Sequence, residues 1–240
     1  MIGIIGFGRF GKLTARYLAE DFEVVVYNRS DKSTEIKRCG ARTASLRDVC
    51  RQKIVIICVP ISVLQDVLAE IEPLLQEGAV VVDVCSVKVY PVRWMQAALP
   101  ETVSILATHP IFGPDSAANS LKGHKIFLSP IRIDKKHYQK VKAYLASKEL
   151  VLIESTPEDH DEQIAVSLAL THYIGRSLSA FGAAPLCIDS EGYKRLLHIL
   201  EVVENDTWQL FHDMHYYNPY AQEKRAAFMQ AMKKISDQLP

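Results

Sequence analysis

The sequence predicts an α/β fold in which a doubly wound, mainly parallel sheet is followed by an all-helical domain. Three observations support this prediction. Short β-branched runs alternate with helix-like segments, a glycine-rich turn follows the first run, and helical periodicity takes over after about residue 155. We therefore divide the chain into an N-terminal domain of residues 1–155 and a C-terminal domain of residues 156–240.

Seven apolar runs are expected to form the strands of the sheet. Near-continuous apolar runs are typical of strands that helices cover on both faces, and their alternation with helices favours right-handed crossovers. The expected strands are residues 2–5, 23–27, 54–59, 79–84, 103–108, 125–130 and 150–155.

Apolar residues at helical spacing dominate the C-terminal part of the chain. A helix is expected to begin at the Thr-Pro-Glu-Asp sequence of residues 156–159 and to end at Gly182. Residues 190–214 and 220–239 show the same spacing. The apolar and aromatic faces of these helices exceed what so short a segment can bury internally, so we expect a homodimer interface in this domain.

Composition excludes several classes of protein. The 28 Lys and Arg residues balance 28 Asp and Glu residues, so no net field favours nucleic acid or anionic lipid. No apolar stretch approaches the ~20 residues that span a bilayer, and the N-terminus lacks the pattern of a signal peptide. The five cysteines form no C-x-x-C pair and are expected to be buried free thiols. We therefore expect a cytoplasmic protein with neither a membrane nor a nucleic acid as partner.

No metal site is expected from the histidines. His212 and His215 are separated by about one helical turn, but no carboxylate or cysteine at diagnostic spacing joins them. We interpret both as surface or interface residues, and His160 as part of a cluster at the start of a helix.

A glycine-rich motif, GFGRFG, follows the first expected strand and opens a helix. Three glycines at this spacing permit a tight turn, the close approach of a pyrophosphate and the packing of helix on strand, while the helix N-terminus offers free N–H groups. This context predicts a Rossmann-type dinucleotide site. Its expected residues are Gly6, Phe7, Gly8, Arg9, Phe10 and Gly11.

The end of the second strand indicates which dinucleotide is bound. An Asp or Glu at this place usually contacts a free ribose hydroxyl, whereas this chain has Asn28, Arg29 and Ser30. Arginine supplies planar donors and a positive charge for a 2′-phosphate, so we expect NADP, with NAD through Asp31 as the alternative. Val59 and Pro60 close the third expected strand and are expected to line the cofactor.

Two polar side chains are expected at the carboxyl ends of neighbouring strands, where α/β sheets bind their ligands. Ser86 follows the fourth expected strand, and His109 follows the fifth. A hydroxyl and an imidazole so placed can form a hydrogen-bonded pair that suits proton abstraction from an alcohol during hydride transfer. Lys88 is interpreted as a solvated lysine at a helix start.

The motifs together resemble those of a known family. The sequences DVCSVK and THPIFGPDS, placed between GFGRFG and the later HDEQIAVSLALTHYIGR and GYKRLL, are similar to the prephenate and arogenate dehydrogenases of tyrosine biosynthesis. The resemblance covers nearly the whole chain in the same order. It implies an oxidative decarboxylation in which hydride leaves C4 of a cyclohexadiene ring for the nicotinamide and the ring carboxylate departs as carbon dioxide.

The resemblance also implies roles for individual residues. His109 matches the catalytic histidine that accepts the hydroxyl proton, and Ser86 matches a serine that positions the reacting groups. The substrate carries two carboxylates, so donors are expected from the second domain and from the turn after His109. The residues implied to bind prephenate or arogenate are His172, Arg176, Lys194, Arg195 and Ser116.

The chain departs from the family pattern at one place. Many relatives have a glutamine or a serine four residues before the helix histidine, where this chain has Leu168, and Ser167 lies roughly 100° away around an α-helix. The residues alone leave two alternatives open. One is another enzyme of the same architecture, a β-hydroxyacid dehydrogenase or an imine or pyrroline-carboxylate reductase, and the other is a non-catalytic NADP-binding regulator.

Overall fold

The computed structural model describes residues 1–240, with the exception of the side chain of Val202. The chain forms two compact units, Met1–Pro157 and Glu158–Pro240. The boundary predicted from the sequence lies after residue 155. Each unit is described by itself below.

The first unit contains one eight-stranded sheet with the strand order β3-β2-β1-β4-β5-β6-β7-β8. All neighbouring strands are parallel except β6 and β7, so the prediction of a mainly parallel sheet is confirmed. The strands are β1 (Ile2–Ile5), β2 (Val24–Tyr27), β3 (Arg42–Thr43), β4 (Ile54–Ile57), β5 (Val80–Asp83), β6 (Ser104–Ile111), β7 (Lys125–Arg132) and β8 (Val151–Glu154).

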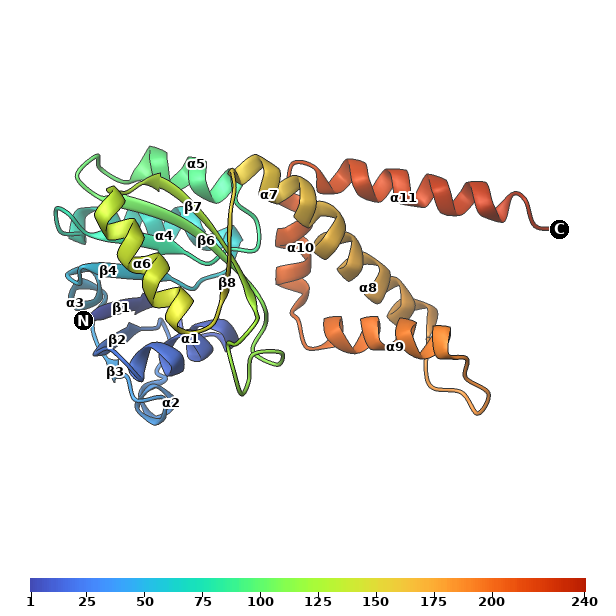
Figure 1. Cartoon of the computed structure of the whole chain (residues 1–240), viewed down its shortest axis with the longest axis horizontal. Helices are drawn as coiled ribbons and strands as arrows, with labels where there is room; N and C mark the ends of the chain where they lie inside the picture. Colours follow the sequence, from blue (N-terminus) through green and yellow to red (C-terminus); the bar gives the residue numbers. More distant parts are fainter. The chain divides into compact units, whose positions relative to one another are not determined.

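Helices connect these strands and cover both faces of the sheet. Right-handed crossovers place α1, α2 and α6 on one face and α3, α4 and α5 on the other, and Figure 1 shows α6 lying across one face. The α-helices are α1 (Arg9–Ala19), α2 (Ser33–Arg38), α3 (Leu46–Cys50), α4 (Leu64–Ile71), α5 (Val89–Ala98) and α6 (Lys135–Ser147), and the 3₁₀ helices are η1 (Ile61–Val63) and η2 (Glu72–Leu74).

Two details of the sheet differ from the sequence prediction. Strand β3 was not expected because it consists of only two residues, both exposed. Strand β6 continues to Ile111, so His109 and Pro110 lie inside a strand and not after it. The extra length is stabilised by antiparallel pairing with β7, in which His109 lies opposite Phe127.

The prediction that all five cysteines are buried free thiols is only partly correct. All five cysteines are free, Cys50 and Cys85 are buried, and Cys187 is exposed. Burial raises the pKa of the Cys58 thiol to about 12, so this side chain is a neutral thiol at physiological pH.

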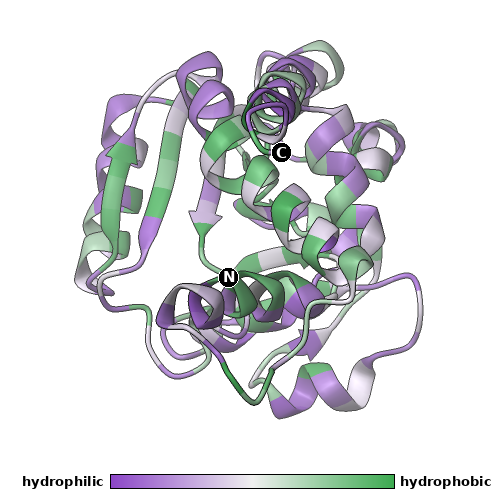
Figure 2. Ribbon diagram, turned by 90° about the vertical axis from the view of Figure 1, so that its right-hand side faces the viewer, coloured by the Kyte–Doolittle hydropathy of each residue, from purple (hydrophilic) through white to green (hydrophobic). Residues whose placement is uncertain are grey.

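The second unit consists of helices. Figure 2 shows hydrophobic and hydrophilic residues alternating along the helices, as expected for elements with one buried face. The elements are α7 (Pro157–Ile164), a π-helical turn η3 (Ala165–Leu170), α8 (Thr171–Phe181), α9 (Glu191–Glu204), α10 (Trp208–Tyr216) and α11 (Ala221–Ser236). Among the described residues, none of the helices is both long enough and apolar enough to cross a membrane.

The helix ends follow local capping signals. Gly182 adopts a left-handed conformation with φ 82° and ends α8 where the sequence predicted it. The helical pattern of residues 190–214 is interrupted, because the Thr207 hydroxyl accepts a hydrogen bond from Leu210 N and starts a new helix, α10.

Candidate active site

The glycine loop between β1 and α1 has the geometry of a phosphate cradle. Gly6 has φ +96°, and a Cβ there would lie 2.4 Å from the carbonyl oxygen of Cys58. A Cβ on Gly11 would lie 2.2 Å from the Gly6 oxygen, so this glycine lets α1 pack directly on the loop. A Cβ on Gly8 would have no neighbour within 4 Å, so the space beside Gly8 is open to a ligand. Since no side chain caps α1, its first N–H groups face that space.

Two residues brace the glycine loop: Phe7 of the motif and Asn28 after β2. The Phe7 side chain is buried in the core, and its amide N–H donates to Asn28 Oδ1 at 2.9 Å. The Asn28 side-chain amide in turn donates to the carbonyl and the hydroxyl of Ser30, each at 3.0 Å. Phe7 therefore offers a ligand only its backbone, and Asn28 braces the loop.

Arg9 connects the glycine loop to the turn that follows His109. Its guanidinium makes two hydrogen bonds of 2.7 Å to the carboxylate of Asp115. Nearby, the Phe10 and Phe112 rings lie 6.2 Å apart, and Tyr17 donates to the carbonyl of Ala117 at 2.8 Å. The sequence motifs did not indicate the pairing of Arg9 with Asp115, because the two residues are 106 positions apart in the chain.

Arg29 is the free cation at the end of β2. Its side chain is exposed, and within the described part of the chain it makes no hydrogen bond or ion pair. Asp31, the alternative contact for NAD, accepts a hydrogen bond from Ser33 N at 2.9 Å, which lowers the pKa of its carboxyl group. Val59 and Pro60 follow β4 and lead into η1, with Val59 half-buried and Pro60 exposed.

Ser86 and His109 lie just beyond the paired ends of two neighbouring strands. Asp83, the last residue of β5, pairs with Ala107 of β6, so Ser86 follows this pair by three residues and His109 by two. His109 is 6% exposed. The expected hydrogen bond between the two side chains does not form, because the buried hydroxyl of Ser86 has no partner among the described residues.

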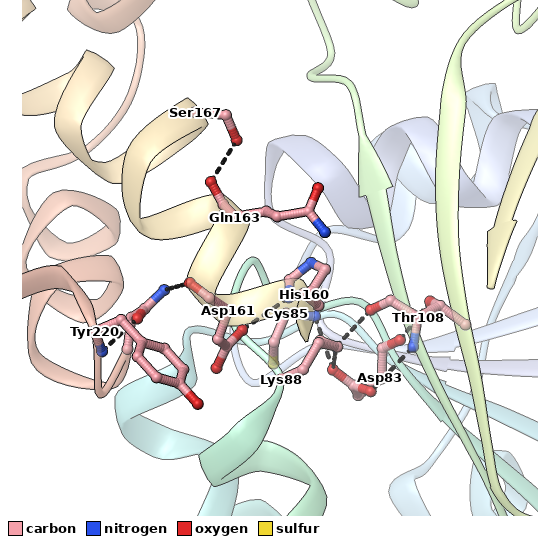
Figure 3. A network of polar contacts seen from close by, with 10 residues as sticks. Asp83, Cys85, Lys88, Thr108, His160, Asp161, Gln163, Ser167 and Tyr220 are labelled. Atoms are coloured by element: carbon pink, nitrogen blue, oxygen red, sulfur yellow. Dashed lines mark hydrogen bonds and ion pairs between the residues drawn. The ribbon is translucent and has the colours of Figure 1, made fainter. Parts of the chain in front are cut away.

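A buried ion pair fixes these strand ends. Lys88 was interpreted as solvated, but its side chain is fully buried and ion-paired with the equally buried Asp83. The Lys88 ammonium also donates to the carbonyl of Thr108 at 2.5 Å, and Figure 3 shows the three side chains converging. The Asp83 carboxylate accepts hydrogen bonds from Cys85 N at 3.0 Å and from Thr108 N at 3.3 Å.

This network explains how the site is held in position. Thr108 is the residue before His109, and its hydroxyl donates to the carbonyl of Asp83 at 2.6 Å. Cys85 is the residue before Ser86. Because the same carboxylate binds both neighbours, Asp83 with Lys88 fixes the backbone on which Ser86 and His109 stand.

Ser116 belongs to the turn after β6. Its hydroxyl accepts from Gly113 N at 3.0 Å and donates to Gly113 O at 3.2 Å, so the side chain closes the turn. Ser116 is nevertheless exposed.

In the helical unit, His172 and Arg176 lie one turn apart on α8. His172 is 3% exposed, and its Nε2 lies 3.7 Å from an Asp206 carboxylate oxygen. Arg176 donates to the Asp206 carbonyl, and its guanidinium carbon lies 4.5 Å from the centre of the Trp208 ring. Burial, with a smaller contribution from Arg176, lowers the pKa of His172 to about 4, so the imidazole is neutral at pH 7.

The basic pair Lys194–Arg195 lies elsewhere on the same unit. A Cβ on Gly175 of α8 would lie 2.6 Å from the Val203 side chain, so α8 packs against the last turn of α9. Arg195 is eight residues before Val203, about 12 Å along the helix. Both basic residues are exposed, and Lys194 pairs with Glu191 at 2.7 Å. The structure therefore does not bring this pair next to His172.

The π-helical turn changes the register of the helix that carries His172. Bonds of π-type link residues five apart, so the α-helical geometry assumed for the residues before His172 does not hold at 165–170. Ser167 is exposed and donates to the Gln163 carbonyl at 2.9 Å, a contact visible in Figure 3. His172 itself lies in α8, after the π-helical turn.

The histidines outside these motifs also have defined positions. His212 is exposed, as expected for a surface residue, whereas His215 packs inside the helical unit with its ring 4.6 Å from Phe211. Burial and Arg225 lower the pKa of His215 to about 4. His160 is buried in α7 and bonded to Asp161 at 2.8 Å.

Comparison with known proteins identifies the family. Residues 14–154 match the family model "Prephenate dehydrogenase, nucleotide-binding domain", and residues 177–240 match "TYRAAT1-like, C-terminal domain". The first match begins after the glycine loop, so the assignment of that loop rests on its own geometry.

Curated relatives match over almost the full chain. Two from Arabidopsis thaliana, arogenate dehydrogenases 1 and 2, are 31% and 30% identical over 99% of this chain. A probable arogenate/prephenate dehydrogenase of Methanocaldococcus jannaschii is 30% identical over 95%. The chain spans 39%, 69% and 54% of the lengths of these three relatives.

Solved structures show the same fold. Prephenate dehydrogenase from A. aeolicus, in complex with hydroxyphenyl propionate and NAD+, superposes with a TM-score of 0.79 at 20% identity, covering 98% of this chain and 89% of that one. Synechocystis arogenate dehydrogenase superposes with a TM-score of 0.72 at 21% identity, covering 99% and 92%. Together with the family-model match and the curated relatives, this similarity shows that the chain belongs to the prephenate and arogenate dehydrogenase family.

Proposed function

We propose that this protein catalyses the NADP-dependent oxidative decarboxylation of prephenate or arogenate in tyrosine biosynthesis. The observation that carries the proposal is the placement of His109 and Ser86 just after the last paired residues of β6 and β5, Ala107 and Asp83, where the buried Asp83–Lys88 pair holds the backbone. The relatives are named for dehydrogenation of these two substrates. Loss of carbon dioxide makes the ring aromatic, so the protein has chiefly to orient the substrate and accept one proton.

The glycine loop fits a dinucleotide. The empty space beside Gly8 and the start of α1, which no side chain caps, suit a pyrophosphate. The exposed guanidinium of Arg29, without a protein partner among the described residues, supports NADP over NAD because it can bind a 2′-phosphate. The dinucleotide, when bound, supplies the hydride acceptor.

His109 acts as the general base. A neutral imidazole is a suitable proton acceptor near pH 7, and His109 is buried in a strand that is paired with β7 on one side and pinned at Thr108 by Asp83. The ring receives the proton of the substrate hydroxyl as the C4 hydride leaves. Because the backbone of His109 is fixed, the imidazole can accept the proton of the substrate hydroxyl without a rearrangement of the strand.

Ser86 positions the reacting groups. Its hydroxyl is buried and has no hydrogen-bond partner among the described residues, which costs free energy in the unliganded protein. A ligand oxygen or amide that satisfies this hydroxyl removes that cost. We therefore assign Ser86 a role in orienting the substrate hydroxyl or the nicotinamide amide.

His172 and Arg176 supply the donors for a substrate carboxylate. The Nδ1 atom of His172 and the Nε atom of Arg176 are both buried without a hydrogen-bond partner in the described structure. Lys194, Arg195 and Ser116 remain candidates for the second carboxylate. The proposal favours Arg176 for the first because its planar guanidinium is already oriented by Asp206 and Trp208.

We further propose a cytoplasmic homodimer formed through the helical unit. Large apolar side chains on this unit are strongly exposed, among them Phe181 at 84% and Ile188 at 94%. A second copy of the chain would remove such surfaces from water.

A four-way steady-state assay tests the proposed function. Prephenate and arogenate are each combined with NADP and with NAD, and formation of the reduced dinucleotide is followed. We expect turnover of at least one diene and a higher kcat/KM with NADP. Turnover only with NAD would overturn the assignment of Arg29, and dinucleotide binding without turnover of either diene would favour a regulator.

A further inference from the structure

The first unit contains an apolar cavity that the proposed reaction does not use. It measures about 330 Å³ and lies between α1, α6 and the face of the sheet that these helices cover. Its floor is formed by alternate residues of the central strands, and its walls by apolar residues of the two helices. Representative lining residues are Leu13, Leu18, Ile54, Val82, Val141 and Leu145.

The topology explains why this face is incompletely covered. Right-handed crossovers place α1 and α2 over β1, β2 and β3, and the reversed direction of β7 and β8 returns α6 to the same face. This connectivity places no helix over β4 and β5, in the gap between α1 and α6. The core on this face accordingly forms two clusters, one under α1 and α2 and one under α6, and only half-buried Ile54 and Val82 pack against both.

Contacts between segments distant in the chain brace α1 beside the cavity. The Tyr144 hydroxyl and the Lys148 ammonium of the α6 region bind Asp21, at 2.9 and 2.6 Å. The Tyr17 hydroxyl donates to the carbonyl of Ala117 at 2.8 Å. These contacts hold α1 at a fixed distance from α6, so the cavity does not collapse by simple approach of the helices.

The polar groups that line the cavity are almost all engaged within the protein. Thr14 donates to the Phe10 carbonyl at 3.0 Å, and Thr108 donates to the Asp83 carbonyl at 2.6 Å. Water needs two or more polar partners to be stable in a cavity, so this interior favours an apolar occupant. Lys140 differs, because its exposed ammonium has no ion pair or hydrogen bond among the described residues.

From this geometry we infer that the cavity between α1 and α6 binds a small molecule with an apolar ring body and a single anionic group. The ring body fills the space over Ile54 and Val82, and the anion pairs with Lys140. A cavity of 150 Å³ accepts benzene, so about twice that volume suits two fused rings. A zwitterionic amino acid fits poorly, since its ammonium group would find no free acceptor.

The position of the cavity separates it from the proposed active site. Thr108 and Pro110 line the cavity, whereas His109 lies between them in β6 and its side chain points to the other face of the sheet. The inference therefore does not depend on the reaction that His109 performs.

Binding of 2-naphthoate to the 240-residue chain tests the inference, with the neutral 2-naphthalenemethanol as the comparison. Calorimetry is expected to show one molecule of 2-naphthoate per chain with a Kd between about 10 μM and 1 mM. Methyl NMR signals of Ile54, Val82 and Leu106 should shift. Saturating NADPH should leave the Kd unchanged, and displacement by NADPH would place the probe in the dinucleotide site and overturn the inference.

Substitutions locate the bound probe. Val82→Phe fills the floor and is expected to weaken binding at least tenfold, whereas Val151→Phe, at an exposed position on β8, should leave binding unchanged. If Val82→Phe does not fold, Val141→Phe fills the same space from α6. Lys140→Met should weaken the naphthoate about two- to fivefold and leave the alcohol unaffected, with Lys136→Met as the control. Failure to bind at millimolar concentration, or undiminished binding to a folded cavity-filling variant, would overturn the inference.

Discussion

The two units of the chain differ in how many buried polar side-chain groups lack a hydrogen-bond partner among the described residues. In the first unit the fully buried Lys88 and Asp83 are paired with each other and hydrogen-bonded to neighbouring backbone. In the helical unit, His172, Arg176 and His215 each have a buried nitrogen without a partner among the described residues. The unpaired nitrogens of His172 and Arg176 are the donors that we propose for a substrate carboxylate, whereas the Asp83–Lys88 pair is satisfied within the protein.

Ser86 is the informative exception in the first unit. Its buried hydroxyl is unpartnered, and it lies three residues after Asp83, next to the paired network. Three of the four residues with such unpartnered groups, Ser86, His172 and Arg176, are the ones proposed to contact a ligand, whereas His215 packs inside the helical unit. Substitutions should separate these residues from the scaffold that supports them.

Replacement of His109 is expected to have the largest effect on activity. His109→Asn removes the proton acceptor but keeps a polar side chain of similar shape, so kcat/KM for the preferred diene should fall about 10²- to 10⁴-fold. The affinity for NADPH and the thermal midpoint should remain close to those of the unchanged protein. His137→Asn, at an exposed histidine of the same unit, is the control. A loss of less than tenfold in the His109 variant would remove this residue from the chemistry.

Breaking the buried ion pair should mainly affect stability. Lys88→Met leaves the Asp83 carboxylate buried and unpaired, and we expect the free energy of unfolding to fall by about 3–5 kcal/mol in urea titrations. Adding Asp83→Asn should recover part of this loss. Lys53→Met, at an exposed lysine, should change the free energy by less than about 0.5 kcal/mol. If Lys88→Met lowered the free energy of unfolding by no more than Lys53→Met does, the buried Asp83–Lys88 pair would not be important for the stability of the first unit.

Substitution of Arg176 tests the helical unit for ligand contact. Arg176→Met should raise KM for the diene about 10- to 100-fold, because a charge-assisted hydrogen bond to a carboxylate contributes roughly 1.5–3 kcal/mol, and kcat should change less. Arg195→Met, at a candidate for the second carboxylate, should raise KM by less than Arg176→Met does. Lys234→Met, at an exposed lysine of α11, is the control and should leave KM within twofold. A larger increase in KM for Arg195→Met than for Arg176→Met would instead assign this carboxylate to the Lys194–Arg195 pair.

A pH dependence of stability is the smallest expected effect. The folded-state pKa of His172 and of His215 is about 4, below the ordinary value of 6.5, so the unfolded chain binds more protons between pH 6.5 and 4. Stability is complete above this window and falls as the pH is lowered through it. In a Trp94→Phe background, the fluorescence of Trp208 reports on the helical unit, and its thermal midpoint should be lower at pH 5 than at pH 7.5.

The paired histidine variants provide the control for that experiment. A protein with His172→Gln and His215→Gln should lose much of the difference between the two pH values. An undiminished difference would assign the pH dependence to other groups. Such a result would weaken the contrast between the two units.

Much of the fold could be predicted from the sequence because its signals are local. The apolar runs that form β1 and β4, the glycine motif and the terminating Gly182 each act within a few residues. The two-residue strand β3 and the extension of β6 through Pro110 depend on neighbouring strands, so no local pattern reveals them. The π-helical turn at 165–170 was also missed, because the sequence there shows only ordinary helical spacing.

The sequence provided candidate residues for the site but did not predict the contacts between them. His109 and Ser86 were singled out because they follow apolar runs, and their roles stay predictions. The hydrogen bond expected between them does not form, and the burial of Lys88 was missed. Burial of a lysine depends on a carboxylate 5 positions earlier and a carbonyl 20 positions later in the chain. A signal existed in the aspartate at the end of β5, since an apolar strand that ends in a buried acid requires a cation.

The most direct test of the proposed function is the stoichiometry of a single reaction. The protein is incubated with NADP and limiting prephenate or arogenate, and NADPH formation and carbon dioxide release are measured in the same sample. An oxidative decarboxylation predicts one carbon dioxide for each NADPH and an aromatic product in equal amount. NADPH formed without carbon dioxide, or carbon dioxide released without NADPH, would contradict the assignment of this chain as a cyclohexadiene dehydrogenase.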